Sequence, residues 1–174
     1  LDARGLDRVP IRGPLSWTVP GCVAGWFALH GKFGRLPLPD VLAPAIAYAE
    51  QGFPLSELIA FYWQRSLKAF AAYENFQKLY APGGRIPAKG DSFRNPELAA
   101  TYRLLAEKGR DAFYKGEIAA RIVAYSKKAG GFFSASRSTN VQKLSAVTTA
   151  PISALRSSGP NTSIIFSTAV GVKA

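Results

Sequence analysis

Proline and glycine divide the stretch from Gly13 to Pro54 into two short amphipathic segments, and this division limits what the chain can fold into. The first segment follows Pro20-Gly21 and ends near Gly34, with its apolar residues mostly on one helical face: Val23, Trp26, Phe27 and Leu29. The second has Asp40 as its expected N-cap and Gly52 as its stop, with apolar residues at helical spacing: Val41, Leu42, Ala45, Ile46 and Ala49. The pattern predicts two helices joined by a short proline-containing turn.

Helical patterns also dominate the rest of the chain as far as Gly130-Gly131. Residues 55–80 have a helical, aromatic-rich pattern with Ser56 and Glu57 as its start signal, and we expect the stripe to pack in a core: Leu58, Ile59, Tyr62, Trp63, Leu67, Phe70 and Tyr73. Further helices are expected from Pro96 to Gly109, with Asn95 as the cap, over 111–114, and from Glu117 onward. Before Pro20, residues 15–19 alternate loosely and predict a short strand.

Glycine and proline also mark a loop over residues 82–91. Its Gly83-Gly84-Arg85 has one feature of a phosphate cradle, but it lacks the spacing of a P-loop or of GxGxxG before a helix. A connecting loop is the better interpretation.

Composition fits a globular protein: 48% of the 174 residues are hydrophobic and 12% are aromatic. No run of eighteen apolar residues occurs, so no membrane span is expected in this chain. The charged opening LDARGLDRVPIRG does not resemble a signal peptide, and the chain contains no methionine. We therefore interpret it as a piece of a longer protein, with the compartment left open.

The net charge of +11 is unevenly distributed, and its distribution argues against a nucleic-acid module. Up to Glu117 basic residues are interspersed with acidic ones, whereas the charged residues after it are all basic: Arg121, Lys127, Lys128, Arg137, Lys143, Arg156 and Lys173. The excess comes in part from missing acids. It does not come from a dense basic patch with aromatic platforms.

Two residues invite a catalytic interpretation, and neither supports it. Cys22 is the single cysteine, on an apolar helix face, and is expected to be a small buried hydrophobe. His30 is the single histidine, at the end of the first helix, where it is expected to cap carbonyl groups. No His/Cys cluster exists for a metal. We assign no catalytic, metal or cofactor-binding residue to this chain.

The short motifs of the sequence identify a family, which its hydrophobic periodicity alone does not. Its motifs follow one another in the order GPLS, TVPG, GWFALH, FGRLPL, VLAPAI, GFP, FRNP, GRDAFY, GEIA and GG, over residues 5–134. In these motifs and their order the chain resembles the large-subunit region of the γ-glutamyltransferase family. The segment that contains TVPG resembles a loop and strand near the family's substrate cleft.

The resemblance implies a fold and an activity. The fold would be mainly α as seen here, the helical layer of an αββα N-terminal-nucleophile hydrolase. The activity would be cleavage of γ-glutamyl amides such as glutathione, with transfer of the γ-glutamyl group to water or an amino acid. The family's catalyst is a threonine at the start of a small subunit, and its processing site lies beyond this chain. The chain would therefore be an inactive fragment whose partners are that small subunit and a small-molecule γ-glutamyl substrate.

Residues carried over from the family are few. Its substrate-carboxylate arginine lies upstream of Leu1 in the usual order, so Arg4, Arg8 and Arg12 receive no such role. Thr148-Thr149 precedes Ala150-Pro151 and comes too early to be the processing site. We interpret it as a coincidence.

The resemblance stops near Ser134, and we divide the chain there into an incomplete family domain, 1–134, and an unmatched tail, 135–174. The tail is rich in serine and threonine and free of acids, and such a composition does not specify a core. Ala150-Pro151-Ile152-Ser153 echoes a family motif in the wrong place. Our hypotheses are a wrong reading frame, a sequence joined from elsewhere, or a disordered end.

Two alternatives remain at this stage. One is a non-enzymatic basic helical module that binds a protein or an anionic partner. The other is an acylase of the same self-cleaving superfamily.

Overall fold

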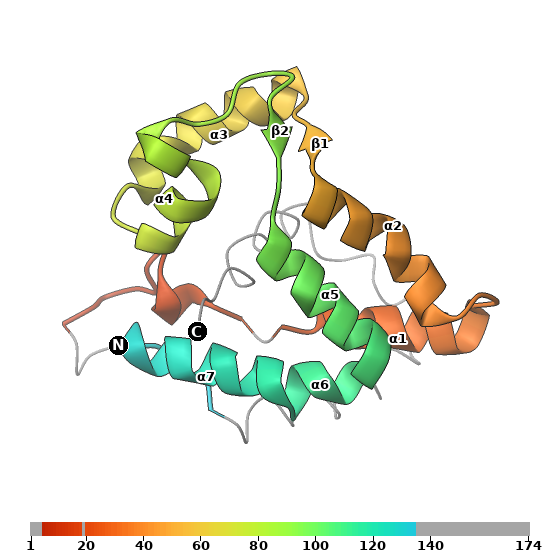
Figure 1. The fold of residues 1–174 in the computed structure, drawn as a ribbon. Helices are drawn as coiled ribbons and strands as arrows, with labels where there is room; N and C mark the ends of the chain where they lie inside the picture. The colour runs from red at the N-terminus through yellow and green to blue at the C-terminus, as the bar shows by residue number, and fades with distance from the viewer. Residues whose placement is uncertain (1–4, 19, 135–174) are drawn as a thin grey trace, which may run out of the picture. The chain divides into compact units, whose positions relative to one another are not determined.

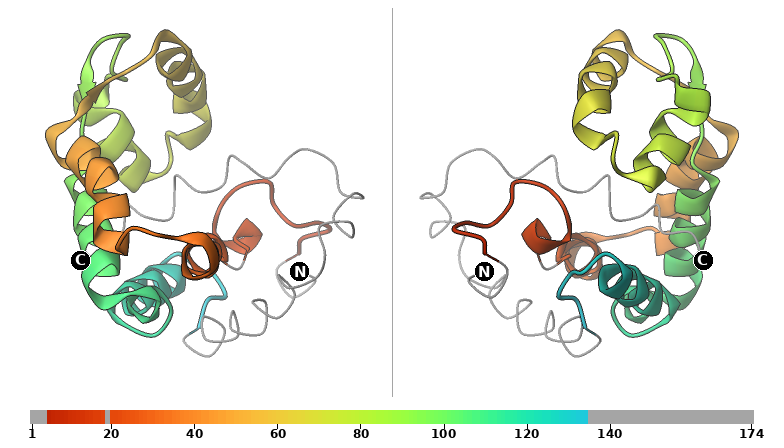
Figure 2. Two further views of the ribbon diagram at one scale, coloured as in Figure 1. Left: turned by 90° about the vertical axis from the view of Figure 1, so that its right-hand side faces the viewer. Right: turned by 90° about the vertical axis from the view of Figure 1, so that its left-hand side faces the viewer.

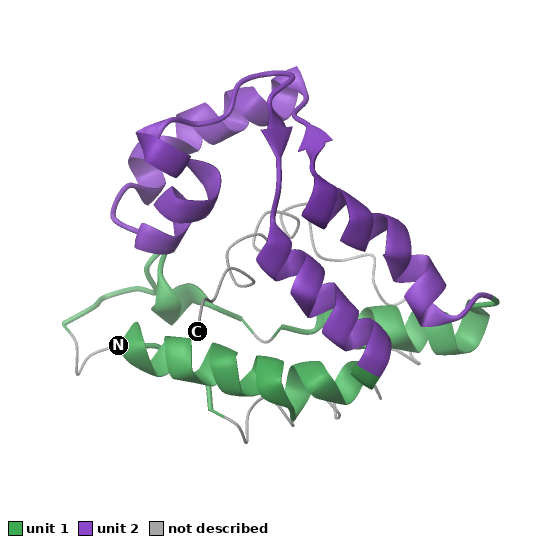
Figure 3. Cartoon of the chain, viewed as in Figure 1, with its two compact units in different colours: residues 1–35, 108–160 green, residues 36–107, 161–174 purple. Residues whose placement is uncertain are grey.

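The computed structural model describes residues 5–18 and 20–134, and these are mainly helical (Figure 1). The described residues divide into two compact units, 5–35 with 108–134, and 36–107 (Figure 3). The predicted tail, Arg4 and Thr148-Thr149 lie outside the described residues. None of the described helices is both long enough and apolar enough to cross a membrane.

The first unit contains a 3-10 turn, Pro14–Ser16, and the helices α1 (Cys22–Phe33), α6 (Arg110–Tyr114) and α7 (Glu117–Lys128). The expected strand over 15–19 is wrong for its first residues. Both the N–H and the hydroxyl of Ser16 donate to the Gly13 carbonyl, at 3.2 and 2.8 Å, and so close a turn. The boundaries expected for α1 are confirmed. Of its predicted apolar face Val23 is buried, whereas Leu29 is 61% exposed.

The second unit contains α2 (Leu38–Gln51), β1 (Phe53–Pro54), α3 (Glu57–Phe70), α4 (Glu74–Tyr80), a 3-10 turn (Pro82–Gly84), β2 (Ser92–Phe93) and α5 (Pro96–Lys108), whose last residue belongs to the first unit. The strands pair antiparallel, Phe53 with Phe93 and Pro54 with Ser92. Figures 1 and 2 show α2 and α5 side by side. The Asn95 N–H donates to the Ala49 carbonyl at 2.8 Å, and Arg103 pairs with Glu50.

Helix caps in this unit follow the sequence with one correction. Ser56 Oγ accepts from the Ile59 N–H at 3.4 Å and Asn95 Oδ1 from the Leu98 N–H at 3.0 Å, as expected. Asp40 is not the N-cap of α2, because the helix starts earlier, at Leu38, and the Pro37 carbonyl accepts from the Asp40 and Val41 N–H groups. Asp40 lies instead in the first turn, where its negative charge interacts favourably with the positive N-terminal end of the helix dipole.

The aromatic stripe of residues 55–80 is only partly a core. Helix α3 ends at Phe70 and α4 begins at Glu74. The Phe70 ring stacks on Phe76, with ring centroids 5.1 Å apart. Trp63 lies edge-on to Tyr80 and Phe93, at 5.0 and 4.8 Å. The other half of the stripe is exposed in the described structure: Leu58, Ile59 and Tyr62 are 61, 41 and 55% exposed.

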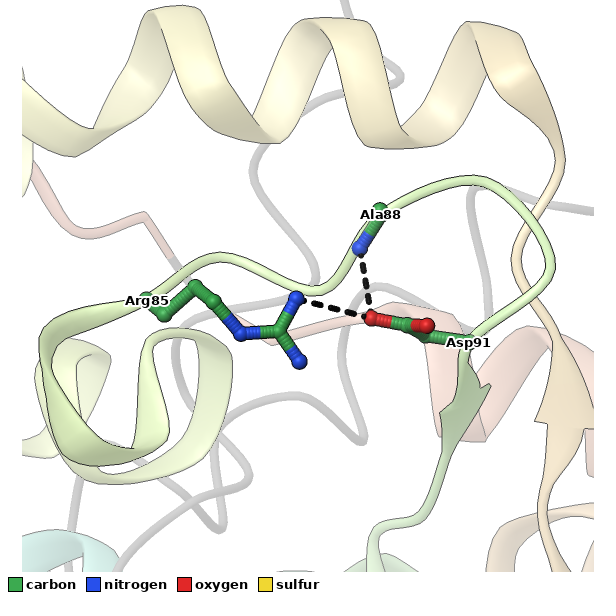
Figure 4. A network of polar contacts seen from close by, with 3 residues as sticks. All are labelled: Arg85, Ala88 and Asp91. Atoms are coloured by element: carbon green, nitrogen blue, oxygen red, sulfur yellow. Dashed lines mark hydrogen bonds and ion pairs between the residues drawn. The ribbon is translucent and has the colours of Figure 1, made fainter.

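The loop over residues 82–91 is held by its own polar contacts (Figure 4). Asp91 accepts from the Ala88 N–H at 2.9 Å and from Arg85 at 3.0 Å, and these contacts, the Ala88 bond first, lower the pKa of the Asp91 carboxyl. The Leu55 N–H donates to the Asp91 carbonyl at 2.9 Å, which ties the loop to the chain before α3. Because Arg85 pairs with Asp91, the geometry favours a connecting loop over a phosphate cradle.

Candidate functional site: a cavity in the first unit

The first unit contains a partly open cavity of about 360 Å³, a size typical of small ligand sites. Three segments form its walls: the chain before α1, the helices α6 and α7, and the chain after the double glycine. The lining residues are Pro14, Leu15, Trp17, Thr18, Pro20, Phe113, Tyr114, Ala119, Ile122, Val123, Phe132, Phe133 and Ser134. The lining is therefore largely apolar, with hydroxyl groups from Thr18, Tyr114 and Ser134.

Aromatic stacking joins the walls. The Trp17 ring stacks on Tyr125 of α7, with centroids 5.7 Å apart and an interplanar angle of 16°. Phe133 approaches the same Trp17 ring at 5.9 Å, tilted by 45°. Stacked and tilted rings of this kind contribute about 0.5–1.5 kcal/mol each beyond the area they bury. Trp17 therefore connects the chain before α1 to α7 and to the chain after the double glycine.

The Tyr114 hydroxyl fixes the start of the first helix. Tyr114 is 2% exposed, and its hydroxyl donates to the Pro20 carbonyl at 2.6 Å and accepts from the Ala24 N–H at 2.9 Å. Burial raises the pKa of Tyr114, opposed by the Ala24 bond and the charge of Arg110. The Arg110 guanidinium lies 5.1 Å from the centre of the Tyr114 ring. The phenol is thus kept in the protonated state that can donate to Pro20.

A second buried hydroxyl fixes the opposite wall. Ser126 of α7 is fully buried, and its Oγ accepts from the Phe133 N–H at 3.0 Å, while its carbonyl accepts from the Gly131 N–H at 2.7 Å. A Cβ on Gly131 would lie 2.6 Å from Ser126 Oγ and 3.1 Å from Pro14 Cβ, and Gly130 has a φ of 76°. The double glycine therefore allows the chain to turn back tightly over the end of α7.

Neither residue with a catalytic interpretation forms a reactive site. Cys22 and His30 are eight positions apart on α1, which at 1.5 Å per residue separates them by about 12 Å. A thiol activated by an imidazole needs hydrogen-bond contact. Burial also raises the pKa of the Cys22 thiol, so less of the nucleophilic thiolate forms.

The cavity lining contains no charged side chain that could pair with a charged group of a ligand. Arg8 and Arg12 are exposed and do not line the cavity. No carboxylate, lysine or arginine occurs among its lining residues, and the described part of the chain has no cluster of three His, Cys, Asp or Glu that would bind a metal. The cavity can hold apolar groups and donate or accept through a few hydroxyls. No lining residue has a positive charge that would pair with the α-carboxylate of a γ-glutamyl group.

Sequence reasoning missed Tyr114 and Ser126 as the residues that fix the walls. One signal was available for Tyr114: α1 begins after Pro20-Gly21, neither of which has a side-chain acceptor, so a side-chain cap can come only from another part of the chain. For Ser126 the signal was weaker, a small polar residue near the end of an apolar helix face, just before a double glycine.

Comparison with known proteins identifies the family. The sequence model of the gamma-glutamyltranspeptidase family matches residues 1–154, which extends past Ser134, where the quoted motifs end. A glutathione hydrolase-like YwrD proenzyme of Bacillus subtilis is 38% identical over 130 residues, 74% of this chain and 25% of that protein. A glutathione hydrolase proenzyme of Pseudomonas aeruginosa is 36% identical over 126 residues, 71% of this chain and 22% of that protein.

The structural comparison agrees. The crystal structure of a cephalosporin acylase from Bacillus halodurans superposes with a TM-score of 0.75 at 35% identity, over 79% of this chain and 27% of that one. The chain thus spans about a quarter of the length of the relatives it matches. Matching sequence over most of its length, in a helical structure shared with these enzymes, shows that the chain belongs to the gamma-glutamyltranspeptidase family.

Proposed function

We propose that this chain is one helical segment of a precursor that matures into two subunits and cleaves γ-glutamyl amides such as glutathione. The complete enzyme would transfer the γ-glutamyl group to water or to an amino acid. The observation that carries the proposal is the family match over residues 1–154. Two relatives bear the names glutathione hydrolase and glutathione hydrolase-like proenzyme, which supports this substrate class over the acyl groups of a cephalosporin acylase.

The chemistry would belong to a threonine at the start of the small subunit. That nucleophile uses its own α-amine as the base, so the helical segment need not contribute one. The composition of the cavity agrees with this division, since its lining residues include no charged group and α1 separates Cys22 from His30. We infer that the isolated chain is inactive.

Exposed apolar residues support a further layer in the complete enzyme. On α3 they include Leu58, Phe61 and Tyr62, at 61, 51 and 55% exposure, and on α1 Leu29 and Phe33, at 61 and 68%. An apolar helix face is stable when another layer covers it. The sheets of an αββα arrangement would supply such layers, and this supports the fold implied by the family resemblance.

Sequencing the gene beyond the codon for Ser134 tests the proposal. The expected result is that one of the three reading frames continues with the family's Asp-Leu, Tyr-Arg-Gly and threonine-containing processing motifs. Expression of that frame should give a protein that cleaves itself into two subunits. A gene in which no frame resumes these motifs would contradict the proposal, because the catalytic threonine would then have no source.

A further inference from the structure

The start of α1 is not capped by its own sequence. The first four N–H groups of a helix have no partner within it, and a side-chain oxygen just before the helix usually accepts from one of them. Here Pro20 and Gly21 occupy that place, and neither has a side-chain acceptor. The first bond back into the helix is made by the Gly25 N–H, to the Gly21 carbonyl at 3.1 Å.

Tyr114 supplies what the local sequence lacks, from 90 positions further along the chain. Its hydroxyl oxygen accepts from the Ala24 N–H, one of the otherwise unpartnered groups, at 2.9 Å. The same hydroxyl donates to the Pro20 carbonyl at 2.6 Å. A single buried oxygen therefore both caps the helix and holds the residue that leads into it.

We infer that Tyr114 is a positioning residue: it caps α1 from a distance and thereby sets the N-terminal wall of the cavity. Pro20 is held directly, and Trp17 and Thr18 line the cavity just before it. The motifs TVPG and GRDAFY are far apart in sequence but act together. TVPG leads into a helix that has no cap of its own, and GRDAFY contains the tyrosine that caps it. This inference goes beyond the proposed function and does not depend on it.

Amide exchange in the unmodified chain gives the first test. Ala24 lies in the first turn of α1, where an amide without a partner exchanges rapidly. We expect its N–H to be as protected as that of Gly25, which bonds within the helix. Exchange of Ala24 at the rate of an unprotected amide, with Gly25 protected, would overturn the inference.

The variant Tyr114→Phe gives the second test, since it removes the hydroxyl and keeps the ring against Arg110. A hydrogen bond of this kind contributes about 1 kcal/mol, so we expect roughly a fivefold loss of protection at Ala24. The indole N–H resonance of Trp17 should shift as the wall loosens, while that of Trp63, which packs in the second unit, stays in place.

Tyr125→Phe is the matched control, because it also removes a phenolic hydroxyl, here from a ring that stacks on Trp17, but leaves the contacts to Pro20 and Ala24 intact. It should leave Ala24 protected. Equal loss at Ala24 in both variants, or an unchanged Ala24 and Trp17 in Tyr114→Phe, would overturn the inference. So would a loss in Tyr114→Phe that is equally large at amides of α3, because the hydroxyl would then act on overall stability alone.

Discussion

Replacing Leu105 with alanine is expected to lower the free energy of unfolding by about 2–5 kcal/mol. Leu105 lies on α5, is 1% exposed, and is one of the two largest fully buried side chains among the described residues. Its truncation removes apolar contacts and leaves a cavity that the surrounding helices fill only in part. Urea unfolding followed by far-UV circular dichroism measures the change.

The matched control is Leu58→Ala, the same chemical change on an exposed helix position. Leu58 lies on α3 and is 61% exposed, so its truncation should change the free energy of unfolding by less than about 0.5 kcal/mol. Similar losses for the two variants would contradict the packing described for α5.

Gly52→Ala is the second substitution expected to have a large effect. Gly52 ends α2 with φ 97° and ψ 166°, a region of backbone space that is essentially reserved for glycine and costs other residues about 1–3 kcal/mol. An added Cβ would also meet Ser92 Oγ and would lie 2.9 Å from Arg94 Cγ and 3.2 Å from the Phe93 carbonyl oxygen. We expect a lower unfolding midpoint and weaker pairing of β1 with β2, measured by urea unfolding and by amide exchange at Phe53 and Phe93.

Gly31→Ala provides the opposite case. Gly31 lies inside α1, and a Cβ there would meet nothing within 4 Å. Alanine favours a helix interior by about 1 kcal/mol over glycine, so this variant should be equally stable or more stable. If both variants lost stability to the same degree, the special backbone of Gly52 would not be the cause.

Local signals predicted most of the helices correctly. Ser56 and Asn95 cap α3 and α5, and Gly52 and Gly109 follow α2 and α5, because each of these residues acts within one turn of its own position. Errors arose where the chain had an equally local competitor. The Ser16 hydroxyl closes a turn on Gly13 in place of the expected strand, and the Pro37 carbonyl starts α2 before Asp40.

The cavity was beyond local signals, because its walls meet through contacts between distant residues. Trp17 stacks on Tyr125, and Tyr114 bonds to Pro20 and Ala24, across about a hundred positions of sequence. The family resemblance assigned these segments to one domain, but periodicity could not predict which of their side chains are in contact. The same limit applies to α3, where Trp63 packs in the core and Leu58 does not, although both belong to one apolar pattern.

We propose that residues 1–134 supply a helical segment, without a catalyst of its own, to a γ-glutamyl-cleaving enzyme. The most direct measurement transfers these residues into the matching place of the Pseudomonas aeruginosa glutathione hydrolase proenzyme and assays release of p-nitroaniline from a γ-glutamyl anilide. We expect the chimera to cleave itself into two subunits and to release p-nitroaniline, while the isolated chain releases none. A folded chimera that stays uncleaved and inactive, or release by the isolated chain, would contradict it.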